Sequence, residues 1–496
     1  MNDNNTSAIV SKVWSFCNPL RDIGVGYGDY LEQLTYLLFL KMADEFSKPP
    51  YNRKLPIPKE YDWESLTAKR GDTLELHYTK LLSELSRQKG ILGQIFVQSQ
   101  NKIKEPAMLY KIIDMIDKEQ WATLGADIKG TIYEGLLEKN AKKKKSGAGQ
   151  YFTPRALIRA MVECVQPQPK KTIADPACGT GGFFLAAYDF IAKGNLDKDQ
   201  KQFLKFKTFF GNEIVANTRR MCLMNMFLHN IGDFDSENFI SPADALIATS
   251  PTTYDYVLAN PPFGRKSSMT ATNEEGEEEA DELTYNRQDF WETSSNKQLN
   301  FVQHIRTMLK STGMAAVVVP DNVLFEGGAG ETVRKKLMET TELHTILRLP
   351  TGIFYKQGVK ANVFFFDNKV ASKEHWTKEI WFYDFRTNIH FTLKKNPLKL
   401  EDLRDFITCY NPNNRHKRKE LYNAETNPEG RWRKFSYDEI IARDKTSLDI
   451  SWIKDKSLTD LDNLPDPDVL AGDIIENLEA GLESFREIMI TINGKE

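Results

Sequence analysis

The sequence predicts an α/β fold in which a doubly wound, mainly parallel sheet follows an N-terminal helical region. From residue 150 to about residue 370, short apolar runs alternate with helical stretches, and strands that alternate with helices usually build a parallel sheet. A glycine-rich loop and an Asn-Pro-Pro-Phe tetrapeptide each follow one of these runs directly. In such sheets, ligands bind at the carboxyl ends of the strands, so both motifs lie where a functional site is expected.

The region before the sheet is mostly helical in pattern, from about residue 8 to residue 140. Apolar residues recur at helical spacing between Val10 and Cys17, and the segment from Tyr30 to Met42 predicts a strongly apolar helix. Four lysines, Lys142 to Lys145, precede a Ser-Gly-Ala-Gly stretch that is typical of a linker. These lysines fit either a solvated hinge or a contact with phosphate groups.

The candidate strands of the sheet are short and apolar. They cover residues 172–174, 207–210, 254–259, 314–319, 345–349 and 362–366. At 496 residues the chain exceeds a single hydrophobic core, so several domains are expected. We predict a helical domain over residues 1–145, a sheet domain over 146–375, an irregular connecting region over 376–463 and a terminal helix over 464–496.

The terminal segment predicts an amphipathic helix with one apolar stripe. Its apolar residues fall at spacings of four and three, at Leu470, Ile474, Leu478, Leu482, Phe485 and Ile488. This stripe fits docking on the same chain as well as pairing with a helix of a partner protein.

The charge balance excludes a chain that wraps nucleic acid by bulk charge. The 66 basic and 69 acidic residues give a formal net charge of -3, so any contact with DNA is expected to be local or beside a more basic partner. The most acidic stretch, residues 274–282, is expected to be mobile until something orders it.

Cysteine usage and hydropathy indicate a cytoplasmic protein without a metal site. The five cysteines include no Cys-x-x-Cys pair and do not cluster with histidine, which fits a reducing compartment and no zinc. The N-terminus is polar, and the apolar run from Leu34 to Leu40 is too short to span a bilayer. We therefore expect neither a signal peptide nor a membrane segment.

The glycine-rich loop has the composition of a cofactor-binding turn. It reads Asp-Pro-Ala-Cys-Gly-Thr-Gly-Gly-Phe from Asp175, and its glycines Gly179, Gly181 and Gly182 permit a tight turn and a close approach of the backbone to a ligand. Loops of this kind bind NAD, FAD or S-adenosylmethionine. Asp175 favours S-adenosylmethionine, because a carboxylate can face its methionine ammonium group but would repel a pyrophosphate.

Two further carboxylates follow the glycine-rich loop. Glu213, in Gly-Asn-Glu-Ile, is placed to accept hydrogen bonds from both ribose hydroxyls of a cofactor. Asp244, in Pro-Ala-Asp-Ala-Leu, is placed to meet the amino group of the cofactor's adenine. The competing interpretation of each residue is a surface carboxylate without a ligand, and it is stronger for Asp244 than for Glu213.

The tetrapeptide Asn260-Pro261-Pro262-Phe263 is the more specific motif, and it suits an enzyme that modifies an exocyclic amine. The lone pair of such an amine is delocalised into the ring. Hydrogen bonds from its N–H groups to the Asn260 side-chain oxygen and the Pro261 carbonyl oxygen would favour a tetrahedral, nucleophilic nitrogen. The two prolines would preorganise these acceptors. Phe263 offers a face for stacking an extruded base, and a core phenylalanine is the alternative.

Together, the motifs predict S-adenosylmethionine-dependent methylation of a base amino group in double-stranded DNA, with adenine N6 as the first choice. Methylation of cytosine N4 or of a protein glutamine uses the same tetrapeptide and stays open. A degenerate methyltransferase fold that serves only as a DNA-binding scaffold is a second alternative, which the intact glycines and Asn260 disfavour.

Five motifs in the same order resemble the methylase (M) subunit of type I restriction-modification systems, and its IA branch in particular, over most of residues 8–460. These motifs are Gly149–Arg155, the glycine-rich loop, Asn260–Phe263, Pro320–Gly328 and Leu349–Phe354. The resemblance implies a Rossmann-like methyltransferase domain behind an N-terminal helical domain.

The resemblance also implies a wider cofactor pocket than the glycine-rich loop alone suggests. In that family the pocket includes the positions of Gln150, Tyr151, Phe152, Thr153, Pro154, Arg155, Thr180, Gly181, Gly182 and Glu213. From the residues alone, Thr153 and Pro154 predict only the start of a helix, with Thr153 as its N-cap and Pro154 at its first position.

The resemblance further implies a multisubunit assembly. Two methylase (M) subunits would join one specificity (S) subunit for modification, and two nuclease-translocase (R) subunits would complete the complex for cleavage. The chain has no obvious recognition domain, because the region after the sheet is neither strongly basic nor rich in base-reading elements. We therefore expect the S subunit to choose the DNA sequence. The insertion between Gly264 and Ser294 is longer than this resemblance leads us to expect.

Overall fold

The computed structural model describes residues 27–121, 153–229, 231–232, 239–263, 268–272, 278–282, 287–354, 359–393 and 396–456, together with residues 15, 285, 471, 474, 475, 478 and 482. It divides into two compact units. Unit 1 comprises residues 1–261 and 304–314, and unit 2 comprises residues 262–303 and 315–496. The chain passes between the units within helix α13 (Lys297–Met308), within strand β7 (Leu309–Pro320) and after Pro261.

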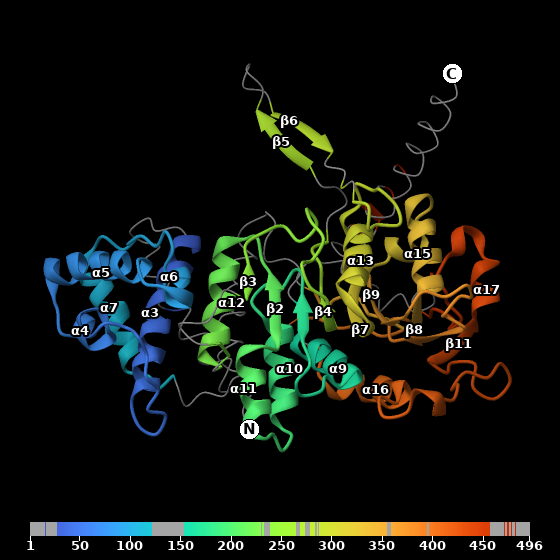
Figure 1. Cartoon of the computed structure of the whole chain (residues 1–496), viewed down its shortest axis with the longest axis horizontal. Coiled ribbons are helices and arrows are strands. Elements are labelled where there is room, and N and C mark those ends of the chain that lie inside the picture. Colours follow the sequence, from blue (N-terminus) through green and yellow to red (C-terminus); the bar gives the residue numbers. More distant parts are fainter. Residues whose placement is uncertain are drawn as a thin grey trace. The chain divides into compact units, whose positions relative to one another are not determined.

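The N-terminal part of unit 1 is helical, as the sequence predicts (Figure 1). Its helices are α3 (Tyr27–Ser47), α4 (Trp63–Thr67), α5 (Gly71–Ser86), α6 (Gly90–Ile95) and α7 (Pro106–Asp117). Helix α3 contains the predicted apolar segment, and all its residues from Leu34 to Leu40 are buried. Apart from Ser15, the segment between Val10 and Cys17 lies outside the described residues, and so does the lysine linker.

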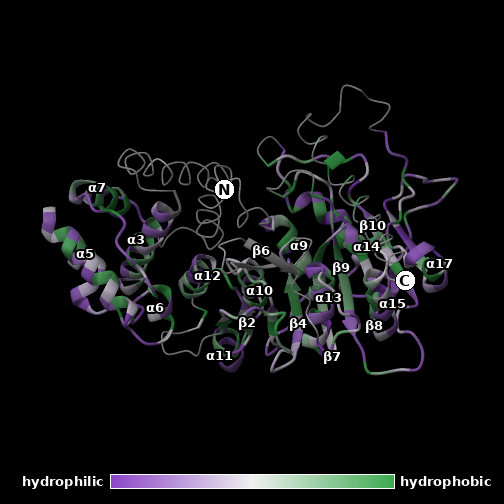
Figure 2. Ribbon diagram, turned by 90° about the horizontal axis from the view of Figure 1, so that it is seen from above, coloured by the Kyte–Doolittle hydropathy of each residue, from purple (hydrophilic) through white to green (hydrophobic). Residues whose placement is uncertain are grey.

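Helix α5 shows why this bundle forms. Its buried residues recur at helical spacing and give the helix one apolar face, which is visible beside its polar face in Figure 2. These residues are Leu74, Tyr78, Leu81, Leu82 and Leu85. Helix α3 is buried continuously from Leu34 to Leu40. It offers apolar surface on which amphipathic helices can bury their apolar faces.

The sheet strands of unit 1 are parallel and lie in the order β4-β1-β2-β3. Their bounds are β1 (Ile173–Asp175), β2 (Phe209–Asn212), β3 (Ile240–Ser241) and β4 (Tyr254–Ala259). They are accompanied by helices α9 (Arg155–Val165), α10 (Gly182–Ala192), α11 (Lys198–Phe206) and α12 (Ala216–Leu228). The predicted parallel sheet is thus confirmed here, although the two-residue strand β3 was not predicted.

Unit 2 holds the end of β7 and four further strands in the order β9-β8-β10-β11. Their bounds are β8 (Thr341–Arg348), β9 (Ala361–Asn368), β10 (Glu379–Asp384) and β11 (Trp432–Ser436). Strand β10 is parallel to β8, whereas β9 is antiparallel to β8 and β11 is antiparallel to β10. This part of the sheet is therefore mixed. Helices α14 (Asn322–Phe325) and α15 (Ala329–Thr340) lie between β7 and β8 in the chain.

The prediction of an irregular region after residue 375 is wrong for residues 376–456. These residues contain β10, β11, α16 (Arg404–Tyr410) and α17 (Tyr437–Ile441). Both strands contribute to the core, because Phe382 and Trp432 are fully buried. The strands are short, and β11 pairs with a strand almost fifty residues earlier, so the local sequence pattern did not reveal them.

Residues 278–282 of the acidic segment take part in regular secondary structure, and the expected mobility of the segment stays a prediction. Strand β5 (Ser268–Thr272) and strand β6 (Glu278–Glu282) form a two-stranded antiparallel ribbon, in which Thr270 pairs with Ala280 (Figure 1). The acidic composition does not prevent this pairing, because successive side chains of a strand point to opposite faces.

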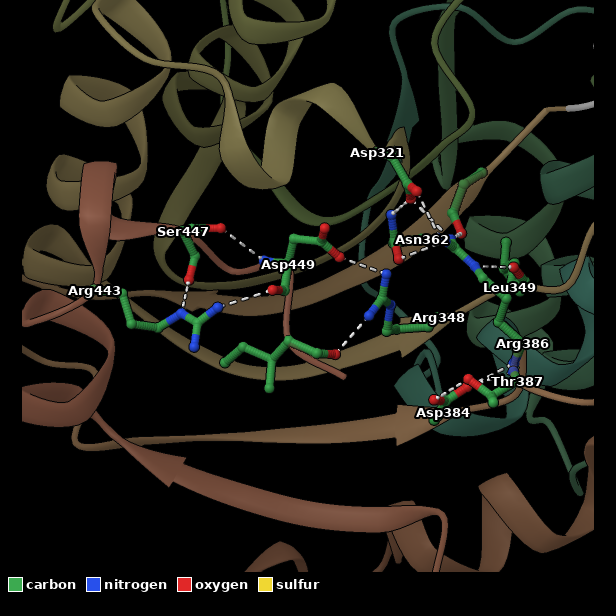
Figure 3. A network of polar contacts seen from close by, with 12 residues as sticks. Asp321, Arg348, Leu349, Asn362, Asp384, Arg386, Thr387, Arg443, Ser447 and Asp449 are labelled. Atoms are coloured by element: carbon green, nitrogen blue, oxygen red, sulfur yellow. Dashed lines mark hydrogen bonds and ion pairs between the residues drawn. The ribbon is translucent and has the colours of Figure 1, made fainter. Parts of the chain in front are cut away.

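One arginine of unit 2 joins the ends of several strands (Figure 3). Arg386 follows β10, and its guanidinium lies 2.6 and 2.8 Å from the two carboxylate oxygens of Asp321, just after β7. It also donates to the carbonyl oxygens of Leu349, after β8, and Ala361, at the start of β9. Burial alone would raise the pKa of Asp321, but Arg386 outweighs this effect and lowers it. Arg386 thus links the start of the segment Pro320–Gly328 to the start of the segment Leu349–Phe354.

The described residues of the terminal helix are helical and exposed. Ile474, Ile475, Leu478 and Leu482 each retain between 52% and 68% of their accessible surface. The stripe residues Leu470, Phe485 and Ile488 lie outside the described part of the chain. No helix that the structure describes combines the length and apolar character of a membrane span. Within the same residues, no group of three or more His, Cys, Asp or Glu side chains is arranged to hold a metal ion.

Candidate active site

The glycine-rich loop connects the end of β1 to the start of α10. Gly181 precedes the helix with a φ of +82°, in the left-handed region where a side chain is strained. The packing also disfavours a side chain at this position, because a Cβ atom at Gly181 would lie 3.0 Å from Cys222 Sγ. Glycine is therefore required here by both backbone conformation and packing. Gly179 also has a positive φ, but a Cβ atom there would meet no atom within 4 Å, so its outer face is open.

Asp175 ends β1 and lies beneath this loop. Its side chain is only 2% exposed, and its Oδ1 accepts a hydrogen bond from the Ala177 backbone N–H at 3.0 Å. The pKa of Asp175 is raised to about 8, chiefly by burial; the hydrogen bond from the Ala177 N–H opposes this rise, and the nearby Glu213 carboxylate adds to it. A buried carboxyl of this kind becomes a strong acceptor when a cation approaches, because a positive partner stabilises the ionised form.

Glu213 follows β2, on the strand next to β1. Its Oε1 accepts a hydrogen bond from the Val215 N–H at 2.7 Å. Burial raises the pKa of Glu213, and backbone N–H groups of Val215 and Gly179 oppose this rise. The neighbouring Ile214 is 63% exposed. A large apolar side chain beside a half-buried carboxylate is suited to the ring and ribose of a nucleoside, and Ile214 was not among the predicted site residues.

Asp244 follows β3, the next strand of the sheet. Its Oδ1 accepts from the Leu246 N–H at 2.9 Å, and Ile247 beside it is 68% exposed. Strands β1, β2 and β3 are parallel neighbours, so Asp175, Glu213 and Asp244 emerge at the same edge of the sheet. The structure therefore brings together the three carboxylates that the sequence placed in one cofactor site.

Asn260 follows β4, on the other side of β1. Its side-chain Nδ2 donates a hydrogen bond of 2.8 Å to Thr153 Oγ1, 107 residues earlier in the chain. This contact fixes the orientation of the amide. Pro261 is buried after it.

The predicted role of Thr153 as a helix cap is wrong. Helix α9 begins at Arg155, and Pro154 is its N-cap with an extended ψ of 135° and no side-chain cap bond. The Thr153 hydroxyl is used by Asn260 instead. Gln150, Tyr151 and Phe152 lie outside the described residues, whereas Arg155 lies close to the loop, since a Cβ atom at Gly182 would be 3.8 Å from one of its guanidinium nitrogens.

The second half of the tetrapeptide belongs to unit 2. The ring of Phe263 meets the ring of Phe354 edge to face, with centroids 6.0 Å apart and an interplanar angle of 63°. Phe354 is only 2% exposed, while Phe263 is partly exposed. The partly exposed ring of Phe263 is thus backed by a buried aromatic residue from the segment that Arg386 contacts at Leu349.

Comparison with known proteins assigns most of the chain to two protein families. Residues 9–116 match the HsdM N-terminal domain, and residues 124–452 match the N-6 DNA Methylase family. The chain is 38% identical to the type I restriction enzyme StySJI methylase subunit of Salmonella typhimurium and 38% identical to the EcoKI methylase subunit of Escherichia coli. Each comparison covers 98% of this chain and 95% of the relative.

Solved structures of related subunits are similar to this chain as well. The EcoKI M protein shares 34% identity and a TM-score of 0.53 with this chain, over 98% of this chain and 96% of that protein. A modification subunit of a putative type I restriction enzyme from Vibrio vulnificus shares 23% identity and a TM-score of 0.70, over 88% of this chain and 94% of that protein, and supports the fold alone.

The fold and the matched family define the class of an S-adenosylmethionine-dependent methyltransferase that acts on adenine N6 in DNA. Within that class, the chain belongs to the methylase subunits of type I restriction enzymes.

Proposed function

We propose that Asn260 and Pro261 activate adenine N6 for methyl transfer, while the edge of the sheet formed by β1, β2 and β3 holds S-adenosylmethionine. The observation that supports this proposal is that the four side chains all lie at the ends of neighbouring parallel strands. Asp175, Glu213 and Asp244 follow three neighbouring parallel strands, and Asn260 follows the strand on the other side of β1.

The residues present fit the cofactor. Asp175 is buried beside the loop and suits the methionine ammonium group, which would favour its ionised form. Glu213 can accept from the two ribose hydroxyls, and Asp244 from the adenine amino group. Ile214 and Ile247 are exposed beside these carboxylates and can cover the adenine ring. The glycines, with Thr180 between them, let the backbone approach the ligand.

The chemistry of the step assigns a role to each residue of the tetrapeptide. When bound, S-adenosylmethionine supplies an electrophilic methyl group on its sulfonium. Asn260 Oδ1 and the Pro261 carbonyl oxygen accept the two N–H groups of the adenine amine, which directs its lone pair out of the ring plane. The Thr153 hydroxyl holds the nitrogen end of the amide, so that the oxygen end faces the substrate. Pro262 restricts the backbone, and Phe263 stacks on the extruded base.

We assign the recognition of the DNA sequence to partner subunits. The near-neutral charge of the chain and the exposed Ile474, Ile475, Leu478 and Leu482, among the described residues of its terminal helix, support a catalytic subunit that works beside another protein. A relative of known structure, with 25% identity and a TM-score of 0.68, comes from work on complex assembly and conformational transition of the type I R-M system. We extend that assembly to this chain, with one S subunit and a second methylase subunit for modification, and with two R subunits added for cleavage.

Mapping of methylated adenines tests the proposal. The chain is co-expressed with its specificity subunit, and genomic DNA is sequenced for N6-methyladenine. We expect methylation at one defined sequence with the wild-type chain, and none with the specificity subunit alone. Methylation of cytosine N4, or of protein and not DNA, would overturn the assignment of the substrate.

A further inference from the structure

Helix α12 packs against the glycine-rich loop. Asn225, which is fully buried on this helix, donates from Nδ2 to the Thr180 carbonyl oxygen at 3.0 Å. Cys222, one turn earlier, places its sulfur 3.9 Å from Cys178 Sγ in the same loop. Met226 also faces the loop, since its sulfur would lie 3.6 Å from a Cβ atom at Gly181. The conformation of the loop therefore depends on where α12 lies.

The first half of α12 is fixed by the N-terminal helices. Arg220 is only 6% exposed, and its Nη1 lies 2.9 Å from Glu32 Oε1 on α3. Its Nη2 donates to the Val97 carbonyl oxygen, just after α6, at 2.9 Å. The guanidinium also lies 5.0 Å from the centre of the Tyr36 ring. All of these residues belong to unit 1.

These two sets of contacts belong to one short helix. Arg220 and Asn225 are separated by five residues, or about 7.5 Å along the axis at 1.5 Å per residue. A helix of this length moves as a rigid element, so a shift at Arg220 reaches Asn225 and the Thr180 carbonyl. Loss of Arg220 would leave Glu32 without this ion pair and weaken the attachment of the first half of α12, where Arg219 would still donate to Gln94 on α6.

We propose that the N-terminal helical part of unit 1 sets the affinity for S-adenosylmethionine through α12, with Arg220 and Asn225 as positioning residues. Neither side chain needs to touch the cofactor. Arg220 anchors the helix to α3, and Asn225 transmits this anchorage to the loop that receives the ligand. The inference rests on the proposed cofactor site at the glycine-rich loop.

Calorimetric titration of the full chain with S-adenosylmethionine tests the coupling. Arg220→Ala and the near-isosteric Asn225→Leu should each weaken binding roughly threefold to tenfold, the range expected for one lost hydrogen bond. Because both act on the same loop through the same helix, the double variant should bind about as weakly as the weaker single variant. Arg220→Lys keeps the charge beside Glu32 and should bind with intermediate affinity.

Two reference variants make the outcome decisive. Lys41→Ala removes an ion pair between Lys41 and Asp117 that joins α3 and α7, and should leave the affinity unchanged. Glu213→Ala removes a proposed cofactor contact and should weaken binding. If Glu213→Ala binds normally, the cofactor site itself is wrong. If Glu213→Ala weakens binding but Arg220→Ala stays within about twofold of wild type, the coupling is wrong. Fully additive losses in the double variant, or an equal loss in Lys41→Ala, would overturn it too.

Discussion

The side-chain amide of Asn260 is held by Thr153, whose hydroxyl oxygen lies 2.8 Å from Asn260 Nδ2. An asparagine amide has a donor end and an acceptor end, and only the acceptor end can receive a hydrogen bond from an adenine amine. With its donor end engaged by Thr153, the amide leaves its acceptor end for the adenine amine of the proposed reaction. Preorganisation of this kind lowers the barrier without adding a contact to the substrate.

Thr153→Val should slow methyl transfer, measured at saturating S-adenosylmethionine. Valine has nearly the shape of threonine but offers no acceptor, so Asn260 loses the bond that orients its amide. The lost hydrogen bond corresponds to about 1 kcal/mol, or roughly a fivefold to tenfold decrease in the single-turnover rate. Thr153→Ser keeps the hydroxyl and should stay near the wild-type rate. Equal rates for the valine and serine variants would contradict this role of Thr153.

Asp175→Asn should raise the stability of the ligand-free chain at alkaline pH. The folded-state pKa of Asp175 is raised to about 8 by burial, above its ordinary value of 3.8. The folded state therefore favours the protonated acid, and stability from this group is lost as pH rises through about 8. Asparagine is neutral at every pH. The melting temperature of the variant should exceed that of wild type by an amount that grows from pH 5 to about pH 8 and then levels off.

Cofactor binding provides the matching control for this variant. The same substitution removes the charge that we assign to the methionine ammonium group, so Asp175→Asn should bind S-adenosylmethionine more weakly while melting at a higher temperature. A pH-independent difference in melting temperature would contradict the raised pKa. Unchanged affinity would contradict the assignment of the ammonium site.

Arg386→Met should destabilise unit 2. The substitution leaves the Asp321 carboxylate, whose side chain is 19% exposed, without its ion pair, and removes donors to Leu349 and Ala361. Removing one partner of a largely buried ion pair lowers the free energy of unfolding by on the order of 3 kcal/mol. Urea denaturation at neutral pH would measure this loss. Asp321→Asn combined with Arg386→Met should recover part of it, because no unpaired charge remains. A loss of stability below about 1 kcal/mol for Arg386→Met would show that the ion pair is dispensable.

Truncation after Asn463 tests the role of the terminal helix. Because Ile474, Ile475, Leu478 and Leu482 are exposed, their removal should cost the chain little of its own stability. We expect the truncated chain to bind S-adenosylmethionine normally, but not to co-purify with the specificity subunit or to methylate DNA. Normal complex formation on size exclusion would contradict partner docking. Loss of the thermal transition together with cofactor binding would show that the helix belongs to the core of this chain.

The sequence predicted the position in the fold of those proposed site residues whose signal is local. Each carboxylate and the tetrapeptide stand directly after a strand or beside a tight turn, so a few adjacent residues identify them. Thr153 shows the limit of such reasoning. Threonine before proline is a good N-cap pattern, but the side chain bonds to Asn260 instead, and no local pattern indicates a partner more than a hundred residues away.

The same limit applies to Asn225 and to the strands of residues 376–456. Asn225 lies within a helix, where asparagine has no special preference, and its role comes from the Thr180 carbonyl of a distant loop. Strands β10 and β11 are six and five residues long and pair across a charged, helical segment. Their existence depends on the sheet that receives them, and a short apolar run alone cannot distinguish a strand from a loop.

Methyl transfer by Asn260→Ala tests the central claim most directly. The measurement is the single-turnover rate of N6-adenine methylation by the variant in complex with its specificity subunit, at saturating S-adenosylmethionine and DNA. We predict a rate decrease on the order of a hundredfold to a thousandfold or more, with cofactor and DNA affinities near those of wild type, because the lost contact acts mainly in the transition state. A rate within about tenfold of wild type would contradict the assignment of Asn260 as the acceptor for the adenine amine.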